Sequence, residues 1–209
     1  MTIRKGAKIF TGLKDIVDPV HTALVVWDVQ NMLVDRSFNQ ETFLKNTKHL
    51  IDKARSHQIP IIYTKITPLA REYESPFRIY MMMKRVGVDD PDKLPQFMVP
   101  GAPEAEIQKD IFPQDGDIVL DKHTPSIFIG THFEPMMHNY GIKTILYTGI
   151  STEIGIASSA RDSANRGFYT VVVGDCVSTS DQEAHEMTLK ILERVCIVSQ
   201  SEVLIKTWG

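Results

Sequence analysis

Residues 143–173, KTILYTGISTEIGIASSARDSANRGFYTVVV, contain two short apolar runs separated by a helix-length segment of mostly small residues. The first run is KTILYT at 143–148 and the second is FYTVVV at 168–173. Unbroken apolar runs of this length, rich in Val, Ile and Tyr, are typical of strands that are covered on both faces. A strand, a helix and another strand in this order predict a right-handed crossover between parallel strands.

Four further runs of the same kind lie outside this unit. They are TALVVW at 22–27, PIIYTK at 60–65, DIVLD at 117–121 and VCIV at 195–198. Helical periodicity fills 40–57 and 181–193, where apolar or small residues recur along one side. We therefore expect an α/β fold, a three-layer α/β/α sandwich around a parallel sheet.

The composition excludes several classes of protein. The chain has 209 residues, 43% of them hydrophobic, which suffices for one domain with a substantial core and excludes a disordered chain. The net charge is -3 and no basic run is present, so nucleic acid is not an expected partner. Apolar stretches of about five residues are far shorter than the roughly 20 that cross a membrane. No apolar segment follows the basic N-terminus as in a secretory signal, so we expect a cytoplasmic protein.

We expect a single domain over 1–209, because no repeat or Gly/Ser linker divides the chain. Residues 1–20 form an N-terminal arm, and 66–116 form an insertion with a helix expected around 71–85. The four prolines of VGVDDPDKLPQFMVPGAPEAE prevent a long helix after it. Since ligands of open α/β sheets bind outside the carboxyl ends of the strands, we expect the insertion to cover the site.

Polar residues follow two of the predicted strands. Asp28 closes the first strand in WDVQN, and Lys122 and His123 follow the third strand in VLDKHTPSIF. Taken singly, the aspartate is equally a cap for backbone amides and the lysine a solvated charge at the rim. Together, a carboxylate and an ammonium that converge at strand ends form a coupled acid–base pair.

The fourth strand runs into TGISTEIGIASSARDSA. Gly149 permits a tight turn, and Ser151 and Thr152 are residue types that cap helix N-termini. Exposed amides at such a terminus can form an oxyanion site, the alternative being an ordinary crossover helix. We expect this turn, Asp28 and Lys122 to converge on one pocket.

These motifs, in this order, resemble the isochorismatase-like hydrolases, also called the cysteine hydrolase superfamily. The resemblance covers roughly 20–205 and includes D-x-Q after the first strand, DKHTPSIFIGT, TGISTEIGIASSARDSANRGF, VVVGDCVST and the later His185. It implies a six-stranded parallel sheet in a Rossmann-like arrangement, a small-molecule substrate and a homo-oligomer, either dimer or tetramer. It also implies a catalytic triad of Asp, Lys and Cys, in which Asp28 takes the acid–base position and Lys122 the lysine position.

The third member of the triad departs from the family pattern. The family turn reads G-x-x-T-x-x-C-V, and aligning Gly149 and Thr152 with it places Gly155 where the nucleophilic cysteine stands. We expect the two cysteines of the chain, Cys176 and Cys196, to be buried packing residues. Nearby hydroxyls such as that of Thr152 are poor nucleophiles, because the motif holds no histidine to act as their base.

A glycine at this position also resembles the isochorismatases proper, which cleave a vinyl ether without covalent catalysis. The aspartate there acts as a general acid, so Asp28 needs a raised pKa, an effect that Lys122 opposes. The D-x-H metal ligands of nicotinamidases are not found in KITPLAREYE after the second strand, so we expect no metal and no cofactor. Candidate substrate contacts are Gln30, Arg78 and His123.

Two functions stay open on the sequence alone. The first is a hydrolase without a cysteine nucleophile, in which Asp28 is general acid or base, Lys122 is its electrostatic partner, and the amides around Ser151 and Gly155 stabilise negative charge. The second is a catalytically silent member that serves as a small-molecule binding module or an oligomeric interaction partner. Retention of Asp28, Gln30 and Lys122 favours the first function. Loss of the cysteine and of a recognisable substrate-contact segment favours the second.

Overall fold

A computed structural model of the chain describes residues 2–4 and 7–209. Its central feature is a six-stranded sheet with the order β5-β4-β3-β6-β7-β8, in which every neighbouring pair is parallel. The strand order reverses between β3 and β6, the place where doubly wound sheets bind their ligands. The α/β fold is thus confirmed, and each of the six apolar runs overlaps a strand. These are β3 (Thr22–Trp27), β4 (Ile61–Ile66), β5 (Ile118–Lys122), β6 (Thr144–Ile150), β7 (Tyr169–Ser178) and β8 (Ile197–Ser199).

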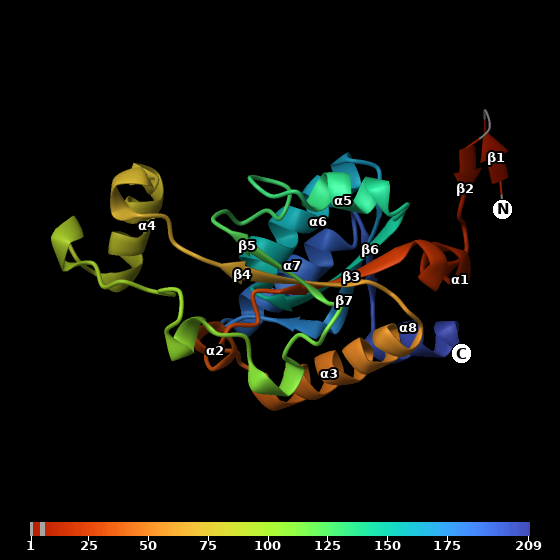
Figure 1. The fold of residues 1–209 in the computed structure, drawn as a ribbon, viewed down its shortest axis with the longest axis horizontal. Coiled ribbons are helices and arrows are strands. Elements are labelled where there is room, and N and C mark those ends of the chain that lie inside the picture. Colours follow the sequence, from red (N-terminus) through yellow and green to blue (C-terminus); the bar gives the residue numbers. More distant parts are fainter. Residues whose placement is uncertain (1, 5–6) are drawn as a thin grey trace.

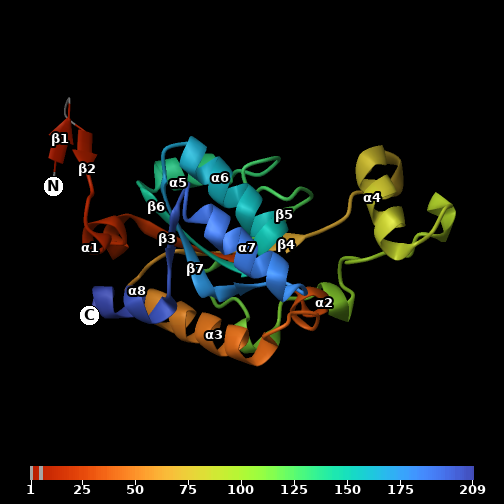
Figure 2. The same ribbon diagram turned by 180° about the vertical axis from the view of Figure 1, so that it is seen from behind.

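Helices cover both faces of this sheet (Figures 1 and 2). On one face lie α3 (Gln40–Ser56) and α8 (Ser201–Trp208). On the other lie α5 (Phe133–Asn139), α6 (Ala157–Asn165) and α7 (Gln182–Leu192). The periodicity of the sequence predicts α3 and α7 to within two residues at each end. It does not single out α5 and α8, whose seven and eight residues are too few for a clear helical pattern.

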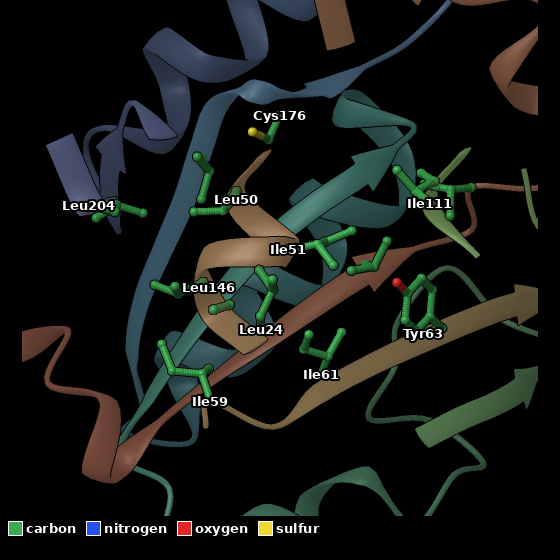
Figure 3. Close-up of a cluster of buried hydrophobic side chains, with 14 of the residues drawn as sticks. Leu24, Leu50, Ile51, Ile59, Ile61, Tyr63, Ile111, Leu146, Cys176 and Leu204 are labelled. Carbon is green, nitrogen blue, oxygen red and sulfur yellow. The ribbon is translucent and has the colours of Figure 1, made fainter. Parts of the chain in front are cut away.

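Two apolar cores hold the three layers together. Leu50 and Ile51 of α3 and Leu204 of α8 pack with Leu24 and Leu146 of the central strands (Figure 3). None of these five side chains is more than 2% exposed. Burial on this scale is the dominant favourable contribution to folding. The second core lies on the opposite face and includes Val25, Phe133, Met137, Ala160 and Leu192.

The N-terminal arm precedes the sheet. Its strands β1 (Thr2–Arg4) and β2 (Ala7–Ile9) form a two-stranded antiparallel sheet of their own. They are followed by the short helix α1 (Leu13–Ile16) and a 3₁₀ turn at Pro19–His21. The hairpin stands away from the rest of the molecule in both views, on the side where β3 begins (Figures 1 and 2).

The insertion leaves the sheet at its carboxyl edge. The helix expected around 71–85 is divided into a 3₁₀ turn at Arg71–Tyr73 and α4 (Pro76–Val86), because Pro76 cannot stand inside a helix and instead begins one. Further 3₁₀ turns lie at Pro91–Lys93, Pro103–Ala105 and Lys109–Ile111. Helix α4 stands apart from the sheet on the side opposite the hairpin (Figure 1). Among the helices of residues 2–4 and 7–209, none has the length and apolar composition of a membrane span.

Gln30 fastens both ends of this insertion to the end of β3. Its side-chain nitrogen donates to the carbonyl oxygens of Ala105 (2.8 Å) and Ile66 (3.3 Å), and its oxygen accepts from the Ile66 amide (2.8 Å). The side chain is fully buried. A short antiparallel bridge between Gln30 and Ile107 continues the contact. The amide that the sequence proposes as a substrate contact is therefore occupied by backbone partners.

We expect Gln30→Leu to lower the free energy of unfolding by about 2–4 kcal/mol, because three hydrogen bonds to the backbone, one buried and two partly buried, lose their partner at nearly constant volume. Urea denaturation measures this change, and hydrogen exchange should show faster exchange within 66–106. Gln182→Leu is the matched control, since Gln182 is exposed and bonds only to Glu186 one turn away. Equal stability losses in the two variants would contradict the anchoring role.

Candidate active site

Asp28 stands at the carboxyl end of β3, beside the reversal in strand order. Its backbone φ of +42° lies in the left-handed region, which Asp tolerates better than most residues. The Thr64 hydroxyl of the adjacent strand β4 donates to Asp28 Oδ1 at 2.5 Å and lies 3.0 Å from the Asp28 amide. Thr64 was not among the residues singled out by sequence, although a polar residue in a buried strand is a usable signal.

Lys122, the last residue of β5, reaches Asp28 from beyond the intervening strand β4. Its Nζ lies 2.6 Å from Asp28 Oδ2 and 3.2 Å from the carbonyl oxygen of Thr124. The exposed fractions are 4% for Asp28 and 1% for Lys122. The two strand-end residues thus form a buried ion pair.

Burial shifts the pKa of each member of this pair in the direction that favours its neutral form. Desolvation raises the pKa of Asp28, against the opposing effects of Lys122 and of the Thr64 hydrogen bond. Desolvation likewise lowers the pKa of Lys122, against the opposing charge of Asp28. Each group therefore depends on its partner to remain charged.

Trp27 lies where a side chain at position 155 would have to be. A Cβ atom on Gly155 would stand 2.1 Å from Trp27 Nε1 and 2.6 Å from Cε2, far inside contact distance. Trp27 is 1% exposed, and its ring also carries the Lys122 ammonium 4.0 Å from a ring centroid, a cation–π contact. The sequence suggests Trp27 as a residue that buries Asp28, but nothing in it indicates that the indole fills the space at position 155.

The turn after β6 differs from an ordinary capped helix. A π-helical turn at Thr152–Ile156 precedes α6, and Ser151 at its start makes no side-chain capping hydrogen bond. The peptide bond between Ile150 and Ser151 is cis. Gly149 has a φ of +113°, and a Cβ there would lie 2.0 Å from the Trp27 carbonyl oxygen, so only glycine fits.

The fold gives Thr152 the histidine that its own motif lacks. Nδ1 of His185, on α7, lies 2.9 Å from the Thr152 hydroxyl, which also lies 3.1 Å from the carbonyl oxygen of Ser178. The single hydroxyl proton points either to the Ser178 carbonyl oxygen, with His185 then donating to Thr152, or to His185 Nδ1, according to the tautomer of the ring. Burial lowers the pKa of His185, which favours the neutral ring. In either case the contact ties the turn to β7 and α7.

His123 and Arg78 lie together at the base of the insertion. His123 Nδ1 is 2.8 Å from the Thr67 carbonyl oxygen, and Arg78 Nη1 donates to the His123 carbonyl oxygen at 2.5 Å. Arg78 lines a cavity of about 620 Å³ between α2 (Asn31–Val34) and the insertion. Asp28, Lys122 and the turn at 149–155 do not line this cavity, so it is distinct from the pair.

Neither Cys176 nor Cys196 lies in the surroundings of a reactive thiolate. Cys176 is fully buried in the core beneath α3 and α8, and desolvation raises its pKa far above the ordinary value. Cys196 is partly buried, donates to the Leu192 carbonyl oxygen, and has a pKa raised to about 11 by desolvation. Both stay protonated at neutral pH, so neither resembles a reactive cysteine. Within the described residues, no group of three or more His, Cys, Asp or Glu side chains lies together as metal ligands would.

Comparisons with known proteins fit this geometry. The isochorismatase domain family matches residues 22–203. An uncharacterised isochorismatase family protein, YwoC of Bacillus subtilis, is 30% identical over 176 residues, which is 84% of this chain and 87% of that protein. The ureidoacrylate amidohydrolase RutB of Pantoea ananatis is 28% identical over 79% of this chain and 72% of its own length.

Solved structures share the fold. A cysteine hydrolase from Pseudomonas syringae pv. phaseolicola superposes with a TM-score of 0.76 at 18% identity, covering 92% of this chain and 94% of the other. The six parallel strands and their covering helices are therefore a known arrangement.

We expect Gly155→Ala to lower the free energy of unfolding by about 1–3 kcal/mol, because the added methyl overlaps the packed indole of Trp27. In a Trp27→Leu background the same change should be less destabilising by about 1 kcal/mol or more, the coupling expected of residues in contact. A double-mutant cycle of urea denaturation measures both values. Gly12→Ala is the control, because a Cβ there meets nothing within 4 Å. Additive effects of the Trp27 and Gly155 changes would show that the two positions do not compete for space.

We expect Lys122→Met to destabilise the protein by about 3–5 kcal/mol at pH 8, where Asp28 loses its buried partner. Without Lys122 the folded-state pKa of Asp28 rises further, while the unfolded chain keeps a value of about 3.9. Protonated Asp28 needs no counter-charge, so the loss relative to wild type should shrink as the pH falls toward 4.

Urea denaturation at a series of pH values measures this difference. Lys48→Met is the control, because Lys48 pairs with Asp52 on the exposed surface, where ion pairs contribute little. A destabilisation by Lys122→Met that stays constant from pH 8 to pH 5 would contradict the dependence of Asp28 on its partner.

Proposed function

The chain belongs to the isochorismatase family, and we propose that this family hydrolase works without a cysteine nucleophile, using Asp28 as its general acid or base. Lys122 is the electrostatic partner of Asp28 in this proposal. The observation that carries it is the buried Asp28–Lys122 pair, 2.6 Å apart, beside a glycine whose side-chain space is filled by Trp27. In this proposal Asp28 transfers the proton, and no covalent nucleophile takes part.

A raised pKa fits Asp28 for general acid catalysis. A carboxyl group that donates a proton near neutral pH needs a pKa well above the ordinary value of about 3.9. Desolvation shifts the pKa of Asp28 in that direction. Lys122 and Thr64 each donate to one oxygen of Asp28, which leaves the second lone pair of either oxygen for a proton. An anionic group of a substrate beside Lys122 would draw the ammonium away and raise the pKa of Asp28 further.

Hydrolysis of a vinyl ether is the reaction that this pair could support without a thiol. The proton passes from Asp28 to the terminal enol ether carbon, which leaves an oxocarbenium ion at the oxygen-bearing carbon. Water adds to that carbon and returns a proton to the Asp28 carboxylate. The resulting hemiketal breaks into a carbonyl product and an alcohol. The amide bond named for the ureidoacrylate relative is a second substrate class, for which ionised Asp28 would act as base toward water.

A catalytically silent binding protein is the second candidate function. The near-complete burial of Asp28, Lys122 and Trp27 favours it, because a substrate reaches the pair only if the surrounding segments move. In this alternative the ion pair is structural and the protein binds a small molecule or a second copy of itself without turnover.

The test begins with a substrate screen on isochorismate, ureidoacrylate and simple amides, with product identification. On the substrate found, Asp28→Asn should lower kcat by about a hundred- to ten-thousandfold with the fold unchanged by circular dichroism. If Asp28 is the acid, kcat/KM should fall as the pH rises through its raised pKa, since only the protonated carboxyl can donate.

Asp52→Asn, on the exposed surface of α3, is the control and should leave kcat unchanged. An Asp28→Asn variant with most of the wild-type activity would refute the assignment. Absence of turnover on the whole panel, together with saturable binding of one of its members, would instead favour the silent binding protein.

A further inference from the structure

The cavity between α2 and the insertion opens to solvent and is separate from the Asp28–Lys122 pair. Its walls are the helix α2, the segment from Ile66 through α4, and the segment 94–100. Its volume of about 620 Å³ lies within the range of small-molecule sites, about 300–1,000 Å³. Most of the lining side chains are apolar, among them Leu33, Ile79, Met82 and Phe97. The space would therefore hold a molecule with an apolar body.

Positively charged side chains outnumber negatively charged ones in the lining of this cavity. Four arginines line it, Arg36, Arg71, Arg78 and Arg85, against the single carboxylate of Glu74. The chain as a whole has a net charge of -3, so this concentration of positive charge is local. A concave apolar site with an excess of guanidinium groups raises the local concentration of anions.

Two of these arginines have no partner of their own. Arg78 is 3.5 Å from Glu74, and Arg71 is 3.4 Å from the exposed Asp92. Within residues 2–4 and 7–209, Arg36 and Arg85 make no hydrogen bond or ion pair that would neutralise them. Both are exposed to solvent, and they come from different walls of the cavity, Arg36 from the segment just after α2 and Arg85 from α4. Planar guanidinium groups bind carboxylates with two parallel hydrogen bonds.

We propose that this cavity binds an organic carboxylate with an apolar aryl or alkyl body, with Arg36 and Arg85 holding the carboxylate. The site requires no turnover and no part of the Asp28–Lys122 pair. It is connected to that pair through Arg78, whose charge contributes to the lowered pKa of Lys122 and whose guanidinium contacts the His123 carbonyl oxygen. Carboxylate binding beside Arg78 therefore provides a route by which an organic acid could influence the pair.

Isothermal titration calorimetry with three probes tests the proposal. 2-Naphthoate supplies both an apolar body and a carboxylate, 2-naphthamide supplies the same body without charge, and acetate supplies the charge without the body. We expect 2-naphthoate to bind at least about tenfold more tightly than either of the others, the ratio expected when a charge-assisted hydrogen bond or the burial of an aromatic ring is lost. Equal affinity for 2-naphthoate and 2-naphthamide, or no saturable binding of 2-naphthoate, would overturn the proposal.

Variants identify the residues. The double variant Arg36→Gln/Arg85→Gln should lose at least about tenfold in affinity for 2-naphthoate and little for 2-naphthamide. Arg194→Gln is the matched control, because Arg194 is an exposed arginine that does not line the cavity. An equal loss in Arg194→Gln would show a general charge effect and would refute the site.

Two further measurements separate this proposal from others. Asp28→Asn should bind 2-naphthoate as tightly as wild type does. The hydrolase proposal and the binding proposal can therefore fail independently of each other. Sedimentation of wild type and the double variant, with and without 2-naphthoate, tests whether a second copy fills the cavity instead. Binding that appears only with a change in oligomeric state would overturn the small-molecule site.

Discussion

The buried contact between Asp28 and Lys122 constrains the arrangement of the strand ends. Two opposite charges removed from water are stable only if they lie close together with their remaining hydrogen bonds satisfied. Asp28 achieves this through the Thr64 hydroxyl and Lys122 through the Thr124 carbonyl oxygen. Strands β3, β4 and β5 must therefore keep their register, because a shift of one residue would turn either charge toward an apolar layer.

Trp27 extends this constraint to the other half of the sheet. Its indole lies under the Lys122 ammonium and against Gly155, while its backbone passes close to Gly149. The turn after β6 can approach β3 this closely only because both positions lack a side chain. A side chain at position 155 is therefore excluded by the indole of Trp27.

The layers of the fold were predictable from sequence because hydrophobic periodicity reports burial directly: TALVVW at 22–27 is β3, and 40–57 contains α3. The proximity of Asp28 and Lys122 could be predicted from the sequence, because the carboxyl ends of parallel strands lie at the same edge of the sheet. The contact of Thr152 with His185, 33 residues later, depends on how α7 packs and leaves no local signal. The hydrogen bonds of Gln30 to the backbone of Ile66 and Ala105 could not be predicted either, because an amide side chain can bind a ligand or the backbone equally well.

Closing the insertion at Gln30 makes it a loop whose two ends meet at one side chain. The entropy of closing such a loop grows only slowly with its length, by about 0.6 kcal/mol for each doubling. Residues between 66 and 105 can therefore be lengthened, shortened or replaced while the sheet, its register and the buried pair stay as they are. Within a common scaffold, this segment is where ligand preference can diverge most freely, and a shared fold then carries little information about what each protein binds.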